Sequence, residues 1–229
     1  MLKATTHQRA ARCFLSTMVE QKFKNFYILD FEATCDAGQQ IEPQEIIEFP
    51  CLQLNSSTLT IESVFHRYVQ PVARPVLTSF CTELTGIVQD MVKNEKPFTE
   101  VLADFNQWML ERTDTGPYAF ITCGDWDLKS ILPRQCALSD VEIPTYFHHW
   151  INLKKPFHKH TNTWPKGMMH MLEILNIKHT GRHHSGIDDA RNIANIVRYL
   201  IEHGVQFDIT SKLPEAVRKE QAVSNTFAS

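Results

Sequence analysis

An apolar run that ends in two acidic residues constrains the fold of this chain more than any other feature. Residues 25–33 read Asn-Phe-Tyr-Ile-Leu-Asp-Phe-Glu-Ala, and aromatic and branched residues of this kind are typical of strands. Because side chains at i and i+2 of a strand point to the same face, Asp30 and Glu32 project together while Phe31 faces the other way. Two adjacent carboxylates repel each other, so we expect a raised pKa or a bound cation. An Asp-x-Glu pair on a solvated edge strand is the alternative, but the apolar residues before it favour a central strand.

Alternating strand and helix patterns follow this segment. Runs of strand-forming residues recur at 45–54, 58–69 and 118–123, with a turn predicted at 55–57. Apolar residues at helical spacing predict helices over 97–111, 125–132 and 187–203. We expect Pro133 to end the second of these helices and Gly204 to stop the third. The order of the elements predicts an α/β fold with a central mixed β-sheet flanked by helices.

The 229 residues suit one folded domain, which we place at 25–210, between a basic segment (1–24) and a polar tail (211–229). No stretch approaches the ~20 apolar residues of a membrane span, so we expect no membrane association. The first 19 residues contain basic residues and no acid. Mitochondrial presequences share this composition, although a solvated basic segment is the simpler interpretation. We therefore expect a cytoplasmic or nuclear protein, with mitochondrial targeting by residues 1–20 as the alternative.

Charge and cysteine content narrow the classes of function. The formal net charge of −3 argues against a protein that coats nucleic acid through a broad basic surface. It is compatible with an enzyme that grips a few nucleotides, because carboxylates that bind metal ions are neutralised. The six cysteines include no Cys-x-x-Cys pair, and several lie in apolar runs. We therefore expect buried free thiols in a reducing compartment rather than a cysteine zinc site or a disulfide framework.

Further chemically active side chains occur where a strand ends and where a helix begins. Asp127 follows the strand at 118–123, and ligand sites gather at such strand ends in α/β sheets. Acids that stabilise a helix N-terminus are the alternative, and Asp125 fits that role well. His184 lies on a glycine-containing loop, five residues before Asp189 in the first turn of the long helix. The unperturbed pKa of histidine lies near neutrality, which suits a general base.

Taken together, four carboxylates and one histidine describe a two-metal phosphodiesterase site: Asp30, Glu32, Asp127, Asp189 and His184. Carboxylate oxygens are the ligands of hard divalent cations, so we predict two Mg²⁺ or Mn²⁺ ions held by the four acids. We expect activity to fall at acidic pH as His184 and the carboxylates take up protons.

Longer motifs around these residues carry a family resemblance. They are Leu29-Asp-Phe-Glu-Ala-Thr-Cys35, Pro43-Gln-Glu-Ile-Ile-Glu-Phe-Pro50, Phe80-Cys-Thr-Glu-Leu-Thr-Gly-Ile87, Cys123-Gly-Asp-Trp-Asp127, Trp150-Ile-Asn-Leu-Lys154 and Gly181-Arg-His-His-Ser-Gly-Ile-Asp-Asp189. Over residues 25–210 the chain resembles the DEDDh group of 3′→5′ exonucleases, and within it the Eri-like branch. The resemblance implies a ribonuclease H-like three-layer fold. It also implies a monomer that removes nucleotides from the 3′ ends of RNA, of single-stranded DNA, or of both.

The same resemblance implies a role for each site residue. Asp30, Glu32 and Asp189 would hold the ion that activates water. Asp30 would also hold the second ion, which Asp127 would support through water. His184 would take the proton of the attacking water. The positions that match nucleotide contacts are Phe31, Ala33, Leu84, Thr85, Gly86, Trp126 and His184. Trp126 could stack on a base or be a core tryptophan, and His183 stands where close relatives often have Pro.

Two other functions stay open at this point. An exonuclease fold without activity would only bind nucleic acid or a protein partner, although such proteins usually lack one of the acids or the histidine. The same chemistry could instead act on very short oligonucleotides or free nucleotides. No motif determines the preference for RNA or DNA, because that choice depends on a contact with the 2′-hydroxyl.

Overall fold

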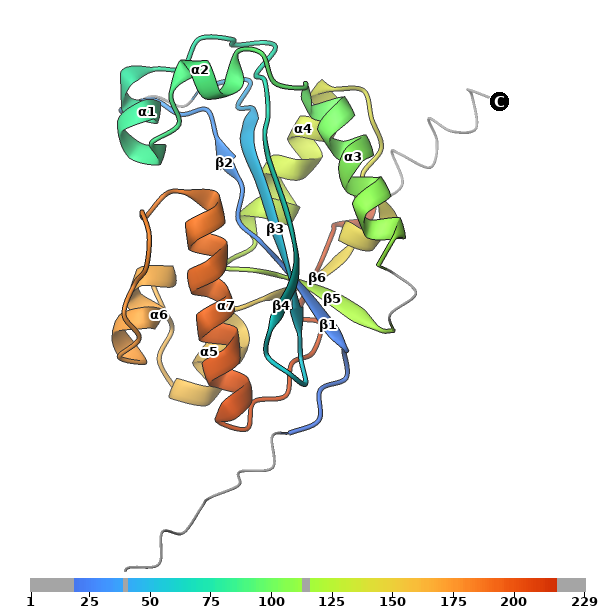
Figure 1. The fold of residues 1–229 in the computed structure, drawn as a ribbon, viewed down its shortest axis with the longest axis vertical. Coiled ribbons are helices and arrows are strands. Elements are labelled where there is room, and N and C mark those ends of the chain that lie inside the picture. Colours follow the sequence, from blue (N-terminus) through green and yellow to red (C-terminus); the bar gives the residue numbers. More distant parts are fainter. Residues whose placement is uncertain (1–18, 39–40, 113–115, 218–229) are drawn as a thin grey trace, which may run out of the picture.

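The computed structural model describes residues 19–38, 41–112 and 116–217, which form a three-layer α/β fold around one mixed sheet (Figure 1). The strands are β1 (Asn25–Leu29), β2 (Glu32–Ala33), β3 (Ile46–Asn55), β4 (Ile61–Tyr68), β5 (Tyr118–Thr122), β6 (His149–Asn152) and β7 (Ser211–Lys212). β5 runs parallel to β1 and β6, whereas β3 is antiparallel to β1 and β4. The expected mixed sheet is confirmed. The possible targeting segment lies almost entirely outside the described residues.

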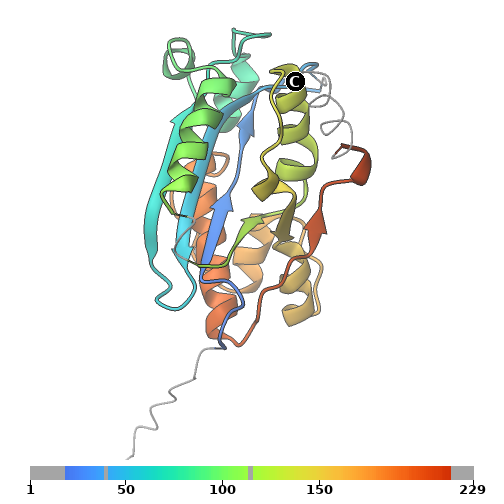
Figure 2. The ribbon, with the colours of Figure 1, turned by 90° about the vertical axis from the view of Figure 1, so that its right-hand side faces the viewer.

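Helices cover both faces of the sheet (Figures 1 and 2). One face carries α3 (Phe98–Leu110) and α4 (Leu132–Leu138), and the other carries α5 (Lys154–Thr161), α6 (Met168–Ile174) and α7 (Gly186–Glu202). Two short helices, α1 (Ser79–Thr85) and α2 (Gln89–Val92), pack around Ile47 of β3. A 3₁₀ turn at Thr145–Phe147 leads into β6.

β1 is buried on both faces, which explains why its sequence is continuously apolar rather than alternating. Phe26 and Ile28 pack in the core beneath α7, while Tyr27 and Leu29 pack in the aromatic core beneath α3. Fully burying side chains of this size contributes about 1.5–3 kcal/mol each relative to leaving them exposed. The central strand is therefore a rigid support for the residues that follow it, starting with Asp30.

The single strand predicted at 25–33 is interrupted in the structure. β1 ends at Leu29 and β2 begins at Glu32, which pairs with β3 in the register of β1 before the register shifts at Ala33. That register places Pro50 of β3 opposite Asp30. Because proline has no amide hydrogen to donate, the ladder of hydrogen bonds is weakened at this point. Asp30 therefore lies in a short non-strand link between the two strands.

The helix predicted to end at Pro133 continues beyond it, so this prediction was wrong. A π-helical turn, η2 (Asp127–Ile131), leads directly into α4, and Pro133 lies in the first turn of α4. The amide of Leu132 donates to the carbonyl of Asp127 across this wider turn. Pro133 therefore follows a widened turn where the hydrogen-bond pattern of the helix changes, and a residue without an amide hydrogen is tolerated at such an irregularity.

The C-terminal part of the fold extends past the boundary expected at residue 210. α7 ends at Glu202, and Gly204 follows with a φ of +82° that favours glycine, as the sequence predicts. β7 then pairs with β6, and Leu213 is fully buried. The sheet therefore includes residues that the sequence assigned to a polar tail. None of the helices in the described ranges has both the length and the apolar character that a membrane span needs.

Candidate active site

The predicted acidic residues come together around the C-terminal end of β1. Asp30 and Glu32 flank the junction of β1 and β2, Asp127 begins η2, and Asp189 lies in the first turn of α7. Carboxylate oxygens of Asp30, Glu32 and Asp189 lie within 4.8 Å of one another. Glu32, Asp127 and Asp189 are buried. Residues far apart in the sequence thus form one compact carboxylate group.

The electrostatics of this group favour a cation. Burial, followed by the charges of Glu48, Asp189 and Asp127, raises the pKa of Glu32 to about 9. Burial and the neighbouring Asp127 and Glu32 raise the pKa of Asp30 well above its ordinary value, and burial raises the pKa of Asp189. A carboxyl with a pKa of about 9, as at Glu32, holds a proton at neutral pH unless a cation takes the place of that proton.

One oxygen of this group supports the same conclusion. Oδ1 of Asp189 is buried and has no hydrogen-bond partner among the described residues. A buried carboxylate oxygen without a partner is costly, because it has lost its contacts with water. A divalent cation coordinated by Asp30, Glu32 and Asp189 would satisfy this oxygen and offset the repulsion within the group. The residues present therefore fit a hard divalent metal ion.

Asp127 has a different environment from the other three acids. Its Oδ1 accepts a hydrogen bond of 3.0 Å from the amide of Phe31. Burial raises the pKa of Asp127, while this hydrogen bond acts in the opposite direction. The compact group within 4.8 Å does not include the Asp127 carboxylate. Asp127 thus ties η2 to the link between β1 and β2, next to the group rather than inside it.

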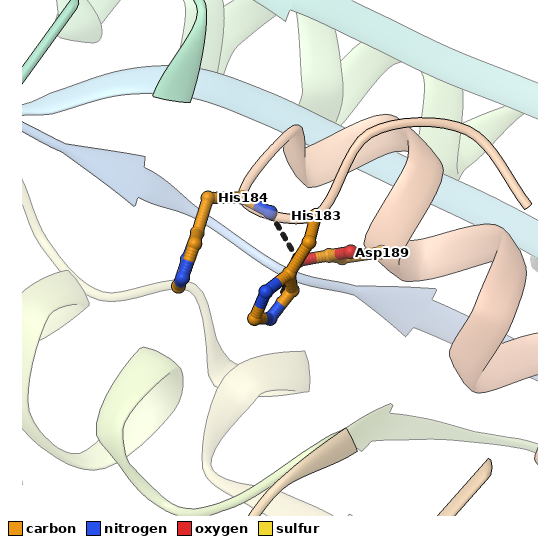
Figure 3. Close-up of side chains that lie close together, drawn as sticks. All are labelled: His183, His184 and Asp189. Carbon is orange, nitrogen blue, oxygen red and sulfur yellow. Dashed lines mark hydrogen bonds and ion pairs between the residues drawn. The ribbon is translucent and has the colours of Figure 1, made fainter. Parts of the chain in front are cut away.

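His184 is held against Asp189 by the loop that precedes α7. Its amide donates to Oδ2 of Asp189 at 2.9 Å, and its φ of +64° turns the loop back towards the helix (Figure 3). The ring of His183 stacks on the ring of His184, with centroids 3.9 Å apart. Burial, together with the neighbouring His183 and Arg182, lowers the pKa of His184 below its usual value. His184 is therefore neutral at neutral pH and can accept a proton.

Glu48 is a residue of this site that sequence reasoning missed. It lies on β3, is 1% exposed, and accepts hydrogen bonds from the amides of Gly186 and Ile187 at 2.9 and 3.1 Å. His66 contacts the same carboxylate, with 2.8 Å between Nε2 and Oε1. An acidic side chain at a helix N-terminus satisfies free amides and interacts favourably with the helix dipole. Glu48 thus holds the start of α7, and with it Asp189, on the sheet.

Gly186 is required for the close approach of α7 to the sheet. A Cβ atom at this position would lie 2.5 Å from the carbonyl oxygen of Asp30 and 3.2 Å from Oε2 of Glu48. No side chain fits at the first of these distances without a backbone shift. The absence of a side chain lets the first turn of α7 sit directly over the acidic link after β1.

The positions predicted to contact a nucleotide fall into two sets. The side chains of Phe31 and Ala33 are buried in the aromatic core, so these residues could contact a ligand only through the main chain. Leu84, Thr85 and Gly86 form the C-terminal end of α1, where Arg182 reaches across from the His184 loop and donates to the carbonyl of Leu84. Arg182 therefore connects this set to the loop that carries His184.

Trp126 is not a core residue, although the sequence left that interpretation open. Its side chain is 42% exposed, and it directly precedes the buried Asp127. A large exposed aromatic ring beside an acidic site is available to stack on a planar ligand.

The chain is similar to known proteins in both sequence and fold. Residues 27–197 match the RNase_T family model, which describes exonucleases. The chain is 48% identical to ERI1 exoribonuclease 3 of Homo sapiens over 218 residues, which are 91% of this chain and 64% of that protein. The chain therefore spans somewhat less than two thirds of the length of this relative.

Two solved structures share the fold. One is the nuclease domain of 3′hExo, a DEDDh family member bound to rAMP, with a TM-score of 0.81 and 37% identity over 83% of this chain and 98% of that chain. The other shows 3′-end specific recognition of a histone mRNA stem-loop by a 3′-exonuclease, with a TM-score of 0.82 and 35% identity over 85% of this chain and 69% of that chain. This chain and these two structures are therefore similar in sequence as well as in fold.

Proposed function

Since the chain belongs to the RNase_T exonucleases, and within them to the DEDDh group and its Eri branch, we propose that it removes nucleotides from the 3′ ends of RNA with the help of divalent metal ions. The observation that carries this proposal is the group of Asp30, Glu32 and Asp189 within 4.8 Å, beside a neutral His184. RNA is the proposed substrate because the relatives are named exoribonucleases. Single-stranded DNA is a second substrate to test.

Four acids would hold the metal. Asp30, Glu32 and Asp189 would bind one Mg²⁺ or Mn²⁺, and Asp30 would share a second ion that Asp127 supports through water. When bound, such ions lower the pKa of water and stabilise the charge that develops on the scissile phosphate. The orphaned Oδ1 of Asp189 supports this assignment, because an ion would be its missing partner.

His184 would act as the general base. It would accept a proton from the water that attacks the phosphorus of the last phosphodiester. The bond from phosphorus to the 3′ oxygen then breaks, which releases a 5′-mononucleotide and leaves a 3′-hydroxyl on the shortened chain. The hydrogen bond from the His184 amide to Asp189 couples the position of the base to that of a metal ligand.

The last nucleotide would lie between two walls of the site. Leu84, Thr85 and Gly86 would contact it from the end of α1, and Trp126 would stack on its base from the start of η2. Phe31 and Ala33 would contribute main-chain contacts only. We further propose a monomer that works in a reducing compartment such as the cytoplasm or nucleus, which the five free thiols of the described residues support.

The test is degradation of a 5′-labelled single-stranded RNA, and of the matched DNA, with Mg²⁺, with Mn²⁺ and with EDTA. We expect a ladder that shortens from the 3′ end, disappears in EDTA and is absent for Asp30→Asn. The two substrates rank the preference for RNA and DNA. Label that stays intact under every metal condition, while RNA still binds, would replace the proposal by a non-catalytic binding module.

A further inference from the structure

A second group of metal-binding atoms adjoins the carboxylates. One ligand atom each of His183, His184 and Asp189 lies within 4.8 Å of the others, and Nε2 of His183 is 4.0 Å from Oδ2 of Asp189. Figure 3 shows the two imidazole rings next to each other on the loop before α7, beside the Asp189 carboxylate. Only Asp189 belongs to both this group and the carboxylate group.

The ligand types of the two groups select different metals. Three carboxylates suit Mg²⁺ or Mn²⁺, whereas two imidazoles with one carboxylate suit Zn²⁺. Ligand atoms on a tetrahedral zinc ion, with bonds of about 2 Å, lie about 3.3 Å apart. The 4.0 Å between His183 and Asp189 needs only a small rotation of one side chain to reach that value. A water molecule would fill the fourth position.

We propose that His183, His184 and Asp189 form an inhibitory Zn²⁺ site. The inhibitory effect rests on the proposed exonuclease function, but the binding site itself does not. Zinc held there would occupy the ring nitrogen with which His184 accepts a proton. It would also draw Asp189 away from the carboxylates that hold the catalytic metal. Zinc at this site and catalysis would therefore exclude each other.

The surroundings of the group place its ligands close together. The rings of His183 and His184 stack with their centroids 3.9 Å apart, so one ring must turn out of the stack for both in-plane lone pairs to point at one ion. Oδ1 of Asp189 and Nε2 of His179 are buried, 3.8 Å apart, and neither has a hydrogen-bond partner in the described part of the chain. Oδ2 of Asp189, the oxygen that faces His183, already accepts a hydrogen bond from the His184 amide, whereas Oδ1 has no hydrogen bond to lose when the carboxylate moves.

The first arm of the test measures metal binding without catalysis. Zn²⁺ affinity is measured by competition with a chromophoric chelator, and Co²⁺ serves as a spectroscopic substitute, because a tetrahedral site gives stronger visible absorption than an octahedral one. His183→Phe keeps a ring that stacks on His184 but has no ligand nitrogen. His158→Gln, at an exposed histidine of α5, is the matched control.

We expect one tight Zn²⁺ per chain and tetrahedral Co²⁺ absorption for the wild type and His158→Gln. His183→Phe should weaken Zn²⁺ binding by about tenfold or more, since even the loss of a group that supports a ligand costs 10–100-fold. Equal Zn²⁺ affinity in the wild type and His183→Phe would overturn the site, because zinc would then bind the carboxylates.

The second arm measures inhibition. RNA cleavage in saturating Mg²⁺ is followed while Zn²⁺ is added, with each variant compared to its own rate without zinc. His183→Phe should need about tenfold more Zn²⁺ for half-inhibition than the wild type or His158→Gln. Cleavage supported by Zn²⁺ in place of Mg²⁺ would contradict the inhibitory role. A chain that binds zinc through His183 but cleaves nothing would contradict the proposed function and leave the metal site standing.

Discussion

Glu48 of β3 accepts the amide hydrogen of Gly186 at 2.9 Å, and this contact joins the central sheet to the first turn of the helix that carries Asp189. The second carboxylate oxygen of Glu48 accepts from Ile187 and contacts His66. The position of Asp189 relative to Asp30 and Glu32 therefore depends on a side chain that is not itself in the metal-binding group. Glu48 is a positioning residue in this arrangement.

Replacing Glu48 by glutamine tests this role. The carboxamide has only one acceptor oxygen, so one of the two amides at the start of α7 loses its partner. Hydrogen bonds to charged groups contribute about 1.5–3 kcal/mol, and we expect a loss of that order in the free energy of unfolding, measured with urea. The cleavage rate should fall by about tenfold or more through displacement of Asp189. The control is Glu62→Gln, at an exposed carboxylate of β4, which should change neither the free energy of unfolding nor the cleavage rate. If Glu48→Gln behaved like this control, Glu48 would not be a positioning residue.

A side chain at position 186 should also displace α7. In Gly186→Ala the new Cβ meets the carbonyl of Asp30 at 2.5 Å, so the helix must move away from the sheet. Overpacking of this kind costs about 1–3 kcal/mol of stability, and we expect weaker Mg²⁺ binding as well. Gly167→Ala is the control, since nothing lies within 4 Å of a Cβ there. Thermal unfolding with and without Mg²⁺ measures both effects, and an unchanged shift of Tm by Mg²⁺ would count against the proposed geometry.

The acids and the histidine that the structure brings close together could be picked out because these residues carry signals that do not depend on tertiary structure. The Asp-x-Glu pair, the acid after β5 and the histidine before α7 each stand at the end of an element that has a clear pattern. The central strand and α7 were predictable for the same reason. Their long apolar patterns leave few alternatives.

The remaining features depend on contacts that no spacing encodes. Glu48 lies inside an apolar run, and its two hydrogen bonds to α7 and its contact with His66 explain a buried acid there. The break after Leu29 follows from the register that places Pro50 opposite Asp30. The strand at 211–212 forms because β6 offers it an open edge, although its own sequence is polar. In each of these cases the local structure depends on a contact with a residue that is distant in the sequence.

Metal removal should make stability depend on pH. Burial and neighbouring charges raise the pKa of Glu32 to about 9 and raise the pKa of Asp30. The folded, metal-free chain thus binds more protons than the unfolded chain between the ordinary carboxyl pKa and about pH 9. Its stability should therefore fall as pH rises through this range. Melting curves in EDTA should show a Tm that falls from pH 5 through pH 7 to pH 9. Added Mg²⁺, or the substitution Glu32→Gln, should reduce the dependence of Tm on pH. A Tm that rises with pH would refute the raised carboxyl pKa values.

Loss of the base should separate catalysis from metal binding. His184→Gln removes the group that accepts the proton of water, and general base catalysis of this kind contributes about 10²–10⁴-fold to the rate. The main-chain hydrogen bond to Asp189 is made by the amide and remains available in this variant. Mg²⁺ should therefore still raise the Tm. The wild-type rate should fall at acidic pH as His184 takes up a proton, with a pKa that burial lowers below the usual value of histidine. A wild-type rate that is constant from about pH 5 to 9 would show that His184 is not the general base.

Trp126 should contribute to RNA binding rather than to folding. Its ring is 42% exposed beside the buried Asp127, so removing it exposes little core. Stacking of one base on an aromatic side chain contributes about 1–3 kcal/mol, which corresponds to about a 5–150-fold loss of affinity in Trp126→Ala. Trp164→Ala is the control, because Trp164 is exposed to a similar degree (55%) but lies between α5 and α6. Binding of single-stranded RNA to an Asp30→Asn background, which prevents cleavage, measures affinity alone. If both tryptophan variants bind RNA as the parent does, the terminal base stacks elsewhere, and the segment from Leu84 to Gly86 becomes the next position to test.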